Sequence, residues 1–100
     1  MERPANAEPR ETFLVEHYRP DLDADELESF AAQACGAVRA LEREGKPLRF
    51  LRSLIVPGDE SCLCVVESAS EHLVREAYTR AGIPFERISP SRVLADSEME

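Results

Sequence analysis

The chain has 100 residues, 43% of them hydrophobic and 32% charged, which suits one domain around a single core. Twelve basic side chains are scattered among twenty acidic ones, and the net charge of −8 argues against binding to nucleic acid. The apolar runs are only strand-sized and the N-terminus has no apolar stretch, so we expect neither a membrane span nor a signal peptide and predict a cytoplasmic protein. Three cysteines cannot all pair within the chain, so a disulfide framework is not expected.

The first predicted strand follows a leader. Residues 1–11 carry two prolines and no periodicity, which predicts a flexible segment. Thr12–Tyr18 is rich in β-branched and aromatic residues and is predicted to be a strand. The folded domain is expected to cover residues 12–95 and to end in an acidic tail at residues 96–100.

A helix is predicted next. Asp23 is placed as its N-cap, with Glu26 in the capping-box position. Apolar side chains then recur at helical spacing over Leu27–Leu41, and Gly45 is expected to end the helix in the left-handed conformation. Gly36, inside the helix, is expected to allow close packing against the sheet.

Two further strands, Leu48–Val56 and Ser61–Glu67, are predicted to form an antiparallel hairpin. The sequence Pro57-Gly58-Asp59 between them is typical of a tight turn, in which Gly58 is expected to accept a positive φ.

Side-chain alternation divides this hairpin into two faces if Arg52 lies opposite Val65. The face that carries Arg52 and Glu67 is predicted to be open, and the face without charge is predicted to pack under the helices. The predicted open set is Phe50, Arg52, Leu54, Leu63, Val65 and Glu67. The predicted core set is Leu51, Ser53, Ile55, Cys62, Cys64 and Val66.

The second helix is expected to begin at a capping box formed by Ser68 and Glu71 and to end at Gly82. The last predicted strand, Phe85–Leu94, is interrupted by Pro90, which belongs at a sheet edge or at a bulge.

The order of these elements is strand-helix-strand-strand-helix-strand. It predicts an α+β protein with a ferredoxin-like βαββαβ fold, a two-layer sandwich with two helices on one face of a four-stranded antiparallel sheet. The first and third strands are expected in the centre. The uncovered face is expected to be solvated, to bind a ligand, or to pair with another subunit.

Cys62 and Cys64 are the most metal-like pair in the sequence, because positions i and i+2 of a strand point the same way. Two thiolates there would suit a soft metal such as zinc or copper. Buried cysteines more often pack as small apolar residues, which is the stronger reading for this pair and for Cys35 in the first helix.

His17 lies near the end of the first strand, beside Glu16. Histidine is the usual metal ligand or general base at neutral pH, and Glu16 or Cys62 could assist it. A half-exposed histidine without function is the more frequent case. Arg52 on an apolar strand face requires a partner, which could be Glu67, Glu16, a dimer mate or an anionic ligand.

Three short segments carry a family resemblance: Phe13-Leu14-Val15-Glu16, the strand around Cys64, and Arg75-Glu76 followed by Ala81-Gly82-Ile83-Pro84. Over residues 12–94 they resemble a family of small bacterial nickel-binding proteins, also described as a domain of unknown function. The resemblance implies a ferredoxin-like domain that is commonly a homodimer and that binds nickel in at least some members.

The resemblance also implies histidine ligands in the second strand and the second helix, where this chain has Arg52 and Ala77. Imidazole is a good nickel ligand, whereas arginine has no lone pair to offer. The remaining candidate metal ligands are His17, Glu16 and Cys64.

Two functions therefore remain open. The first is a non-enzymatic, dimeric nickel-binding protein. The second is a small-molecule-binding protein or enzyme, of isomerase or cyclase type, that uses the open sheet face as a pocket lined by Arg52 and Glu67. Arg52 would hold an anionic oxygen or carboxylate, and His17 or Glu16 would move a proton. A protein-interaction subunit whose open face serves only for dimerisation is a third possibility.

Overall fold

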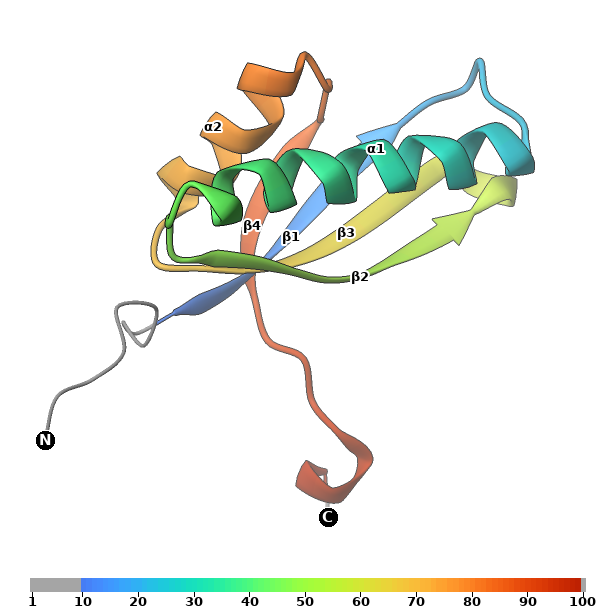
Figure 1. The fold of residues 1–100 in the computed structure, drawn as a ribbon. Coiled ribbons are helices and arrows are strands. Elements are labelled where there is room, and N and C mark those ends of the chain that lie inside the picture. Colours follow the sequence, from blue (N-terminus) through green and yellow to red (C-terminus); the bar gives the residue numbers. More distant parts are fainter. Residues whose placement is uncertain (1–9, 100) are drawn as a thin grey trace, which may run out of the picture.

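The computed structural model describes residues 10–99 and has the predicted order of elements (Figure 1). The helices and strands are β1 (Glu11–Tyr18), α1 (Ala24–Arg43), β2 (Leu48–Val56), β3 (Ser61–Ser68), α2 (Glu71–Ala81) and β4 (Arg87–Ser91). The four strands form one antiparallel sheet in the order β2-β3-β1-β4. This is a ferredoxin-like α+β fold, with β1 and β3 in the centre as predicted.

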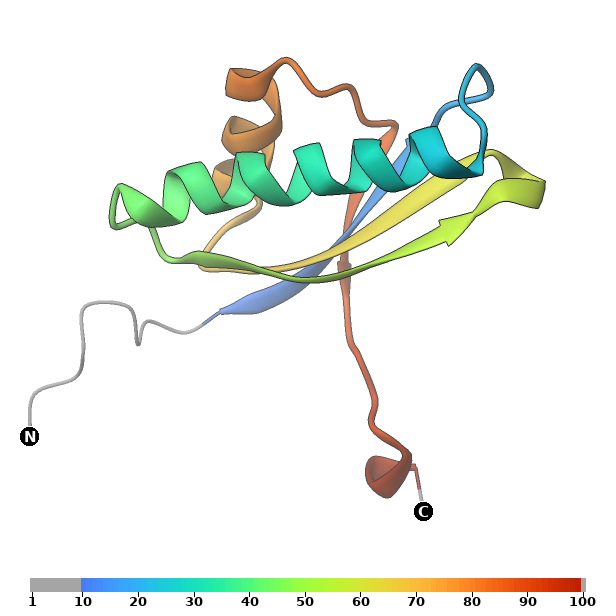
Figure 2. The same cartoon turned by 45° about the vertical axis from the view of Figure 1, so that its right-hand side comes forward.

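Both helices cover the same face of the sheet, and the two views of Figures 1 and 2 agree on this. The core lies between the two layers. It consists of alternate side chains of the central strands and the apolar stripe of α1, which includes Leu27, Val38 and Leu41. No helix in the range 10–99 is long and apolar enough to cross a membrane.

The predicted capping box begins α1. The Glu26 N–H donates to Asp23 Oδ1 (2.8 Å), and the Asp23 N–H donates to Glu26 Oε1 (3.0 Å). After the helix, Gly45 has φ of 90°, as predicted. The expectation for Gly36 is wrong, because this residue is exposed and a Cβ there would meet nothing within 4 Å.

The hairpin has the predicted register, with Arg52 opposite Val65. Its turn differs from the prediction, since Pro57–Asp59 forms a short 3-10 turn and the residue with positive φ is Glu60 (53°), not Gly58. A 3-10 turn keeps its own residues at negative φ and leaves the chain reversal to the residue that follows it.

A bulge between Phe50 and Arg52 corrects the predicted faces. Phe50 lies opposite Val66 and packs against the core, whereas the prediction placed Phe50 on the open face. The bulge adds one residue, Leu51, so the alternation reverses on its N-terminal side. From Arg52 to the turn, the predicted alternation is confirmed.

The N-cap of α2 is Ser70 rather than the predicted Ser68. Ser70 Oγ accepts from the Leu73 N–H (3.2 Å). Ser68 is instead the last residue of β3, buried opposite Glu11 and Leu48, where its hydroxyl bonds the backbone of Ser70. The helix ends at Gly82 with φ of 70°, as predicted.

Strand β4 is shorter than predicted and lies at an edge of the sheet, the position expected for a strand that contains Pro90. After Ser91 the chain leaves the sheet, and residues Asp96–Glu98 form a short 3-10 turn. At the other end, β1 begins at Glu11 rather than Thr12, and the rest of the predicted leader, residues 1–9, lies outside the described residues.

Candidate functional site

The sheet face that the helices do not cover is called the open face below. The centre of this face is apolar, and its charged side chains lie at the periphery. The apolar members are Leu14, Leu54, Val56, Leu63 and Val65. The charged members are Glu16, Arg49, Arg52, Glu67 and Arg87.

Glu16 and His17 lie on opposite sides of the sheet, because neighbouring residues of a strand point in opposite directions. Glu16 is on the open face, where its Oε2 accepts from Arg87 Nε (2.7 Å). His17 points into the core and is 1% exposed. The sequence prediction that Glu16 assists His17 therefore has no geometric basis in this arrangement.

His17 is held by one hydrogen bond and two aromatic rings. Its Nδ1–H donates to the carbonyl oxygen of Pro84 (2.8 Å), and its ring makes edge contacts with Phe30 (4.9 Å between centroids) and Tyr78 (5.4 Å). Because Pro84 can only accept there, the proton is on Nδ1 and Nε2 carries a lone pair. Nε2 is buried and has no hydrogen-bond partner among the described residues.

Burial lowers the pKa of His17 below its usual 6.5. The hydrogen bond to Pro84 raises this pKa. Of the nearby charges, Arg19 lowers the pKa and Glu86 raises it. His17 is therefore a neutral core histidine at pH 7.

Cys62 and Cys64 are both fully buried on the core side, with their sulfur atoms 3.8 Å apart. The first proton of the pair leaves Cys62, whose pKa is lowered because the Cys64 thiol can donate to its thiolate. The same hydrogen bond, together with burial, raises the pKa of Cys64. Burial also raises the pKa of Tyr78, next to Cys64, and the Tyr78 hydroxyl has no hydrogen-bond partner in the described chain.

The three predicted metal ligands do not converge. His17 and Cys64 share the core side and Glu16 lies beyond the sheet. Among residues 10–99, no three His, Cys, Asp or Glu side chains form a group that could hold a metal ion. His17, Cys62 and Cys64 are buried on the core side, and a metal ion would have to pass through the packed interior to reach any of them.

Arg52 and Glu67, the predicted ligand-binding pair, share the open face without pairing to each other. Glu67 Oε1 lies 3.7 Å from Arg10 Nη1 and 4.0 Å from Arg49 Nη2. Arg52 lies opposite Val65 on the neighbouring strand. In the described part of the chain no carboxylate lies within ion-pair distance of Arg52. The sequence analysis allowed four partners for Arg52. Glu67 and Glu16 are now excluded within one chain, so a dimer mate or an anionic ligand remains.

The sequence analysis missed a donor pair on the surface of α2. His72 Nε2 lies 4.0 Å from Glu76 Oε1, and the His72 side chain is 82% exposed. The i,i+4 spacing of the two residues on one helix was the signal that could have found them. Ala77, at the position where the family resemblance implies histidine, is buried against the core instead.

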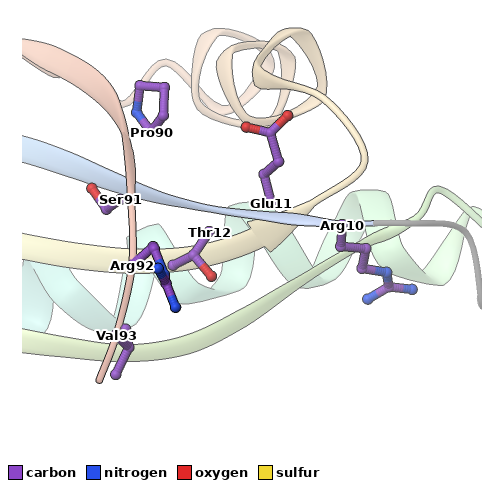
Figure 3. Close-up of a pocket in the computed structure, with 7 residues that line it drawn as sticks. All are labelled: Arg10, Glu11, Thr12, Pro90, Ser91, Arg92 and Val93. Atoms are coloured by element: carbon purple, nitrogen blue, oxygen red, sulfur yellow. The ribbon is translucent and has the colours of Figure 1, made fainter. Parts of the chain in front are cut away.

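A surface groove of about 560 Å³ lies where the end of β4 meets the start of β1 (Figure 3). Arg92 and Val93 leave β4 on one side of it, and Arg10 stands at the start of β1. Thr12 and Ser91 contribute hydroxyl groups, and Glu11 points to the opposite side of the sheet in the close-up. The lining thus combines two guanidinium groups and two hydroxyls with one carboxylate, that of Glu11, and the Arg10 guanidinium is also 3.7 Å from Glu67.

The fold and these side chains define a small α+β protein with one buried histidine, His17, and one exposed histidine, His72. Residues 13–90 match the family described as nickel-responsive, SCO4226-like proteins, and the chain belongs to that family.

The crystal structure of SCO4226 from Streptomyces coelicolor A3(2) has the same fold, with a TM-score of 0.63. The match covers 84% of this chain and 99% of that chain at 23% sequence identity. No curated protein sequence matches significantly.

Proposed function

We propose that this protein is a cytoplasmic, homodimeric nickel-binding member of its family. Membership in a nickel-responsive family supports nickel as the metal. The three free cysteines suit a compartment in which thiols stay reduced. The observation that carries the proposal is the pair of donor atoms on α2, because it is accessible from solvent without any opening of the core.

The geometry of this pair fits a shared metal ion. Two ligands that each lie about 2.1 Å from one ion are separated by no more than about 4.2 Å, and His72 Nε2 and Glu76 Oε1 are 4.0 Å apart. Glu76 Oε2 accepts from Arg80 (2.7 Å), which fixes the carboxylate and leaves Oε1 toward the imidazole. Imidazole and carboxylate are both ligands that nickel accepts.

A buried site at His17 is the competing location. The lone pair of Nε2 has no partner there, and the Cys64 thiol lies on the same side of the sheet. Binding at this site would require the core to open, and the cysteine would have to lose a proton whose pKa is raised. The exposed pair has neither requirement.

Titration of untagged protein with NiCl₂ at pH 7.5 tests the proposal. The chain has only two histidines, so His72→Ala and His17→Asn form a matched pair. We expect His72→Ala to weaken nickel binding about tenfold or more, with a smaller loss for Glu76→Gln, whereas His17→Asn retains the wild-type affinity.

The other results of this titration are also informative. If folded His17→Asn loses nickel binding while His72→Ala keeps it, the metal binds in the core. Absence of nickel uptake by the wild-type protein would reject the function itself.

We infer the homodimer from the chemistry of the open face. Apolar side chains occupy its centre, and Leu54 is 59% exposed in a single chain. A face of this kind is typically covered in a stable small protein, and a second copy offers the same surface in a twofold arrangement.

Sedimentation velocity checks the dimer. Leu54→Glu is expected to raise the dimer dissociation constant about tenfold or more, because it buries a charge in the interface without disturbing the monomer core. Gln33→Glu places the same charge on an exposed position of α1 and is expected to change nothing. Equal dimer strength in the wild type and Leu54→Glu would contradict the open face as the interface.

A further inference from the structure

The C-terminal segment Arg92–Met99, called the arm below, leaves the domain instead of packing on it. In both Figure 1 and Figure 2 it extends beyond the sheet on the side opposite the helices, which is the side of the open face. The radius of gyration is 14.2 Å, larger than the value of about 13 Å expected for a compact chain of this length. The arm is thus projected toward the place where a second subunit would sit.

The arm carries three of the five exposed large hydrophobic side chains of the described chain. Of five large hydrophobic side chains that are exposed, Val93, Leu94 and Met99 belong to it, with exposed fractions of 50%, 47% and 61%. Side chains of this kind on an extended terminal segment indicate a surface that is covered by another molecule.

The charges along the arm favour a second copy of this chain as that molecule. The arm begins with Arg92 and ends with the acidic turn that contains Asp96 and Glu98. Two identical segments with this polarity are complementary only when they run antiparallel, because the basic start of one then meets the acidic end of the other. A twofold axis between two copies produces this arrangement.

The groove at the root of the arm supplies the receiving site. It has a volume of about 560 Å³ and is flanked by the guanidinium groups of Arg10 and Arg92 (Figure 3). No carboxylate from the described chain lies within ion-pair distance of Arg92. The four residues before the turn, Arg92 to Ala95, span up to about 13 Å when extended, and the 3-10 turn adds about 6 Å, whereas four strands are about 14 Å across. An arm can therefore reach past the partner's sheet.

We propose that the arms of two copies run antiparallel across the twofold axis of the dimer, each placing its acidic turn in the groove at the root of the other arm. The inference rests on the proposed homodimer and adds its second contact. The open faces supply the apolar centre of the interface, and the arms lock the two subunits by exchanged ion pairs.

Charge-reversed full-length chains test the exchange. Arg92→Glu alone, and Asp96→Arg with Glu98→Arg, are each expected to raise the dimer dissociation constant about tenfold or more, because like charges then meet across the axis. Mixing these two variants is expected to restore wild-type affinity, since each arm of the mixed dimer meets an opposite charge. Arg39→Glu, on the exposed side of α1, is the control.

Each other outcome overturns the inference. An arm that folds back on its own subunit would give no recovery on mixing the two variants. A dimer that Leu54→Glu dissociates, but that the arm variants leave unchanged within about threefold, would contradict the arms while keeping the open-face interface. If the wild-type protein stays monomeric at every concentration, both the arm exchange and the homodimer are wrong. The nickel titration tests the metal function independently of this result.

Discussion

Replacement of Tyr78 by alanine is expected to lower the free energy of unfolding by about 3–5 kcal/mol. The side chain is the largest of those that are fully buried, and its ring lies 5.4 Å from the His17 ring and 6.1 Å from the Phe85 ring. Its removal leaves a cavity between α2 and the sheet that neighbouring rings cannot fill by small shifts. Urea unfolding followed by circular dichroism measures this change.

Tyr78→Phe is the matched control for this prediction. The hydroxyl is buried and makes no hydrogen bond of standard geometry in the described chain, with the Cys64 thiol near it. Its removal therefore loses at most a weak contact with sulfur and relieves a desolvated polar group. We expect Tyr78→Phe to remain within about 1 kcal/mol of the wild type or to exceed it. A phenylalanine variant as unstable as the alanine variant would show that the hydroxyl makes an essential bond.

The element order could be predicted because local signals and global packing agree in this chain. The capping box at Asp23, the apolar stripe of α1 and the glycines at positions 45 and 82 each act within a few residues and lead to the same architecture. The central position of β1 and β3 then follows from the fold itself.

The local errors arose where two similar residues competed for one role or where an extra residue entered a strand. Ser68 and Ser70 both suit an N-cap, and only the length of β3 decides between them. The bulge after Phe50 gives no clear signal in the sequence, although it moves that side chain from one face to the other. Turn chemistry indicated the chain reversal but not that Glu60 would carry the positive φ.

The candidate sites were harder to predict because function depends on which side chains converge in space. Strand parity alone separates Glu16 from His17, because neighbouring residues of a strand point to opposite faces of the sheet. Burial of His17 depends on Phe30 and Tyr78, which come from two different helices. The exposed pair on α2 needed only helical spacing, yet one histidine and one glutamate at i,i+4 are common on any helix surface.

The second large effect is a loss of stability in mild acid that depends on His17. Burial lowers the pKa of His17 in the folded protein, whereas in the unfolded chain it has its usual value of 6.5. Above that pH both states hold the neutral imidazole and stability is complete. As the pH falls below it, the unfolded state binds the proton first, so the free energy of unfolding decreases until the folded pKa is passed.

One proton limits this decrease to about 1.4 kcal/mol per pH unit. His17→Asn removes the titrating group and keeps an N–H donor for the Pro84 carbonyl, so its free energy of unfolding is expected to change little between pH 7 and pH 5. His72→Asn, at the exposed histidine, is expected to retain the wild-type slope. Urea titrations at half-unit steps of pH compare the three proteins, and an equal slope in His17→Asn and the wild type would mean that the acid sensitivity comes from carboxylates.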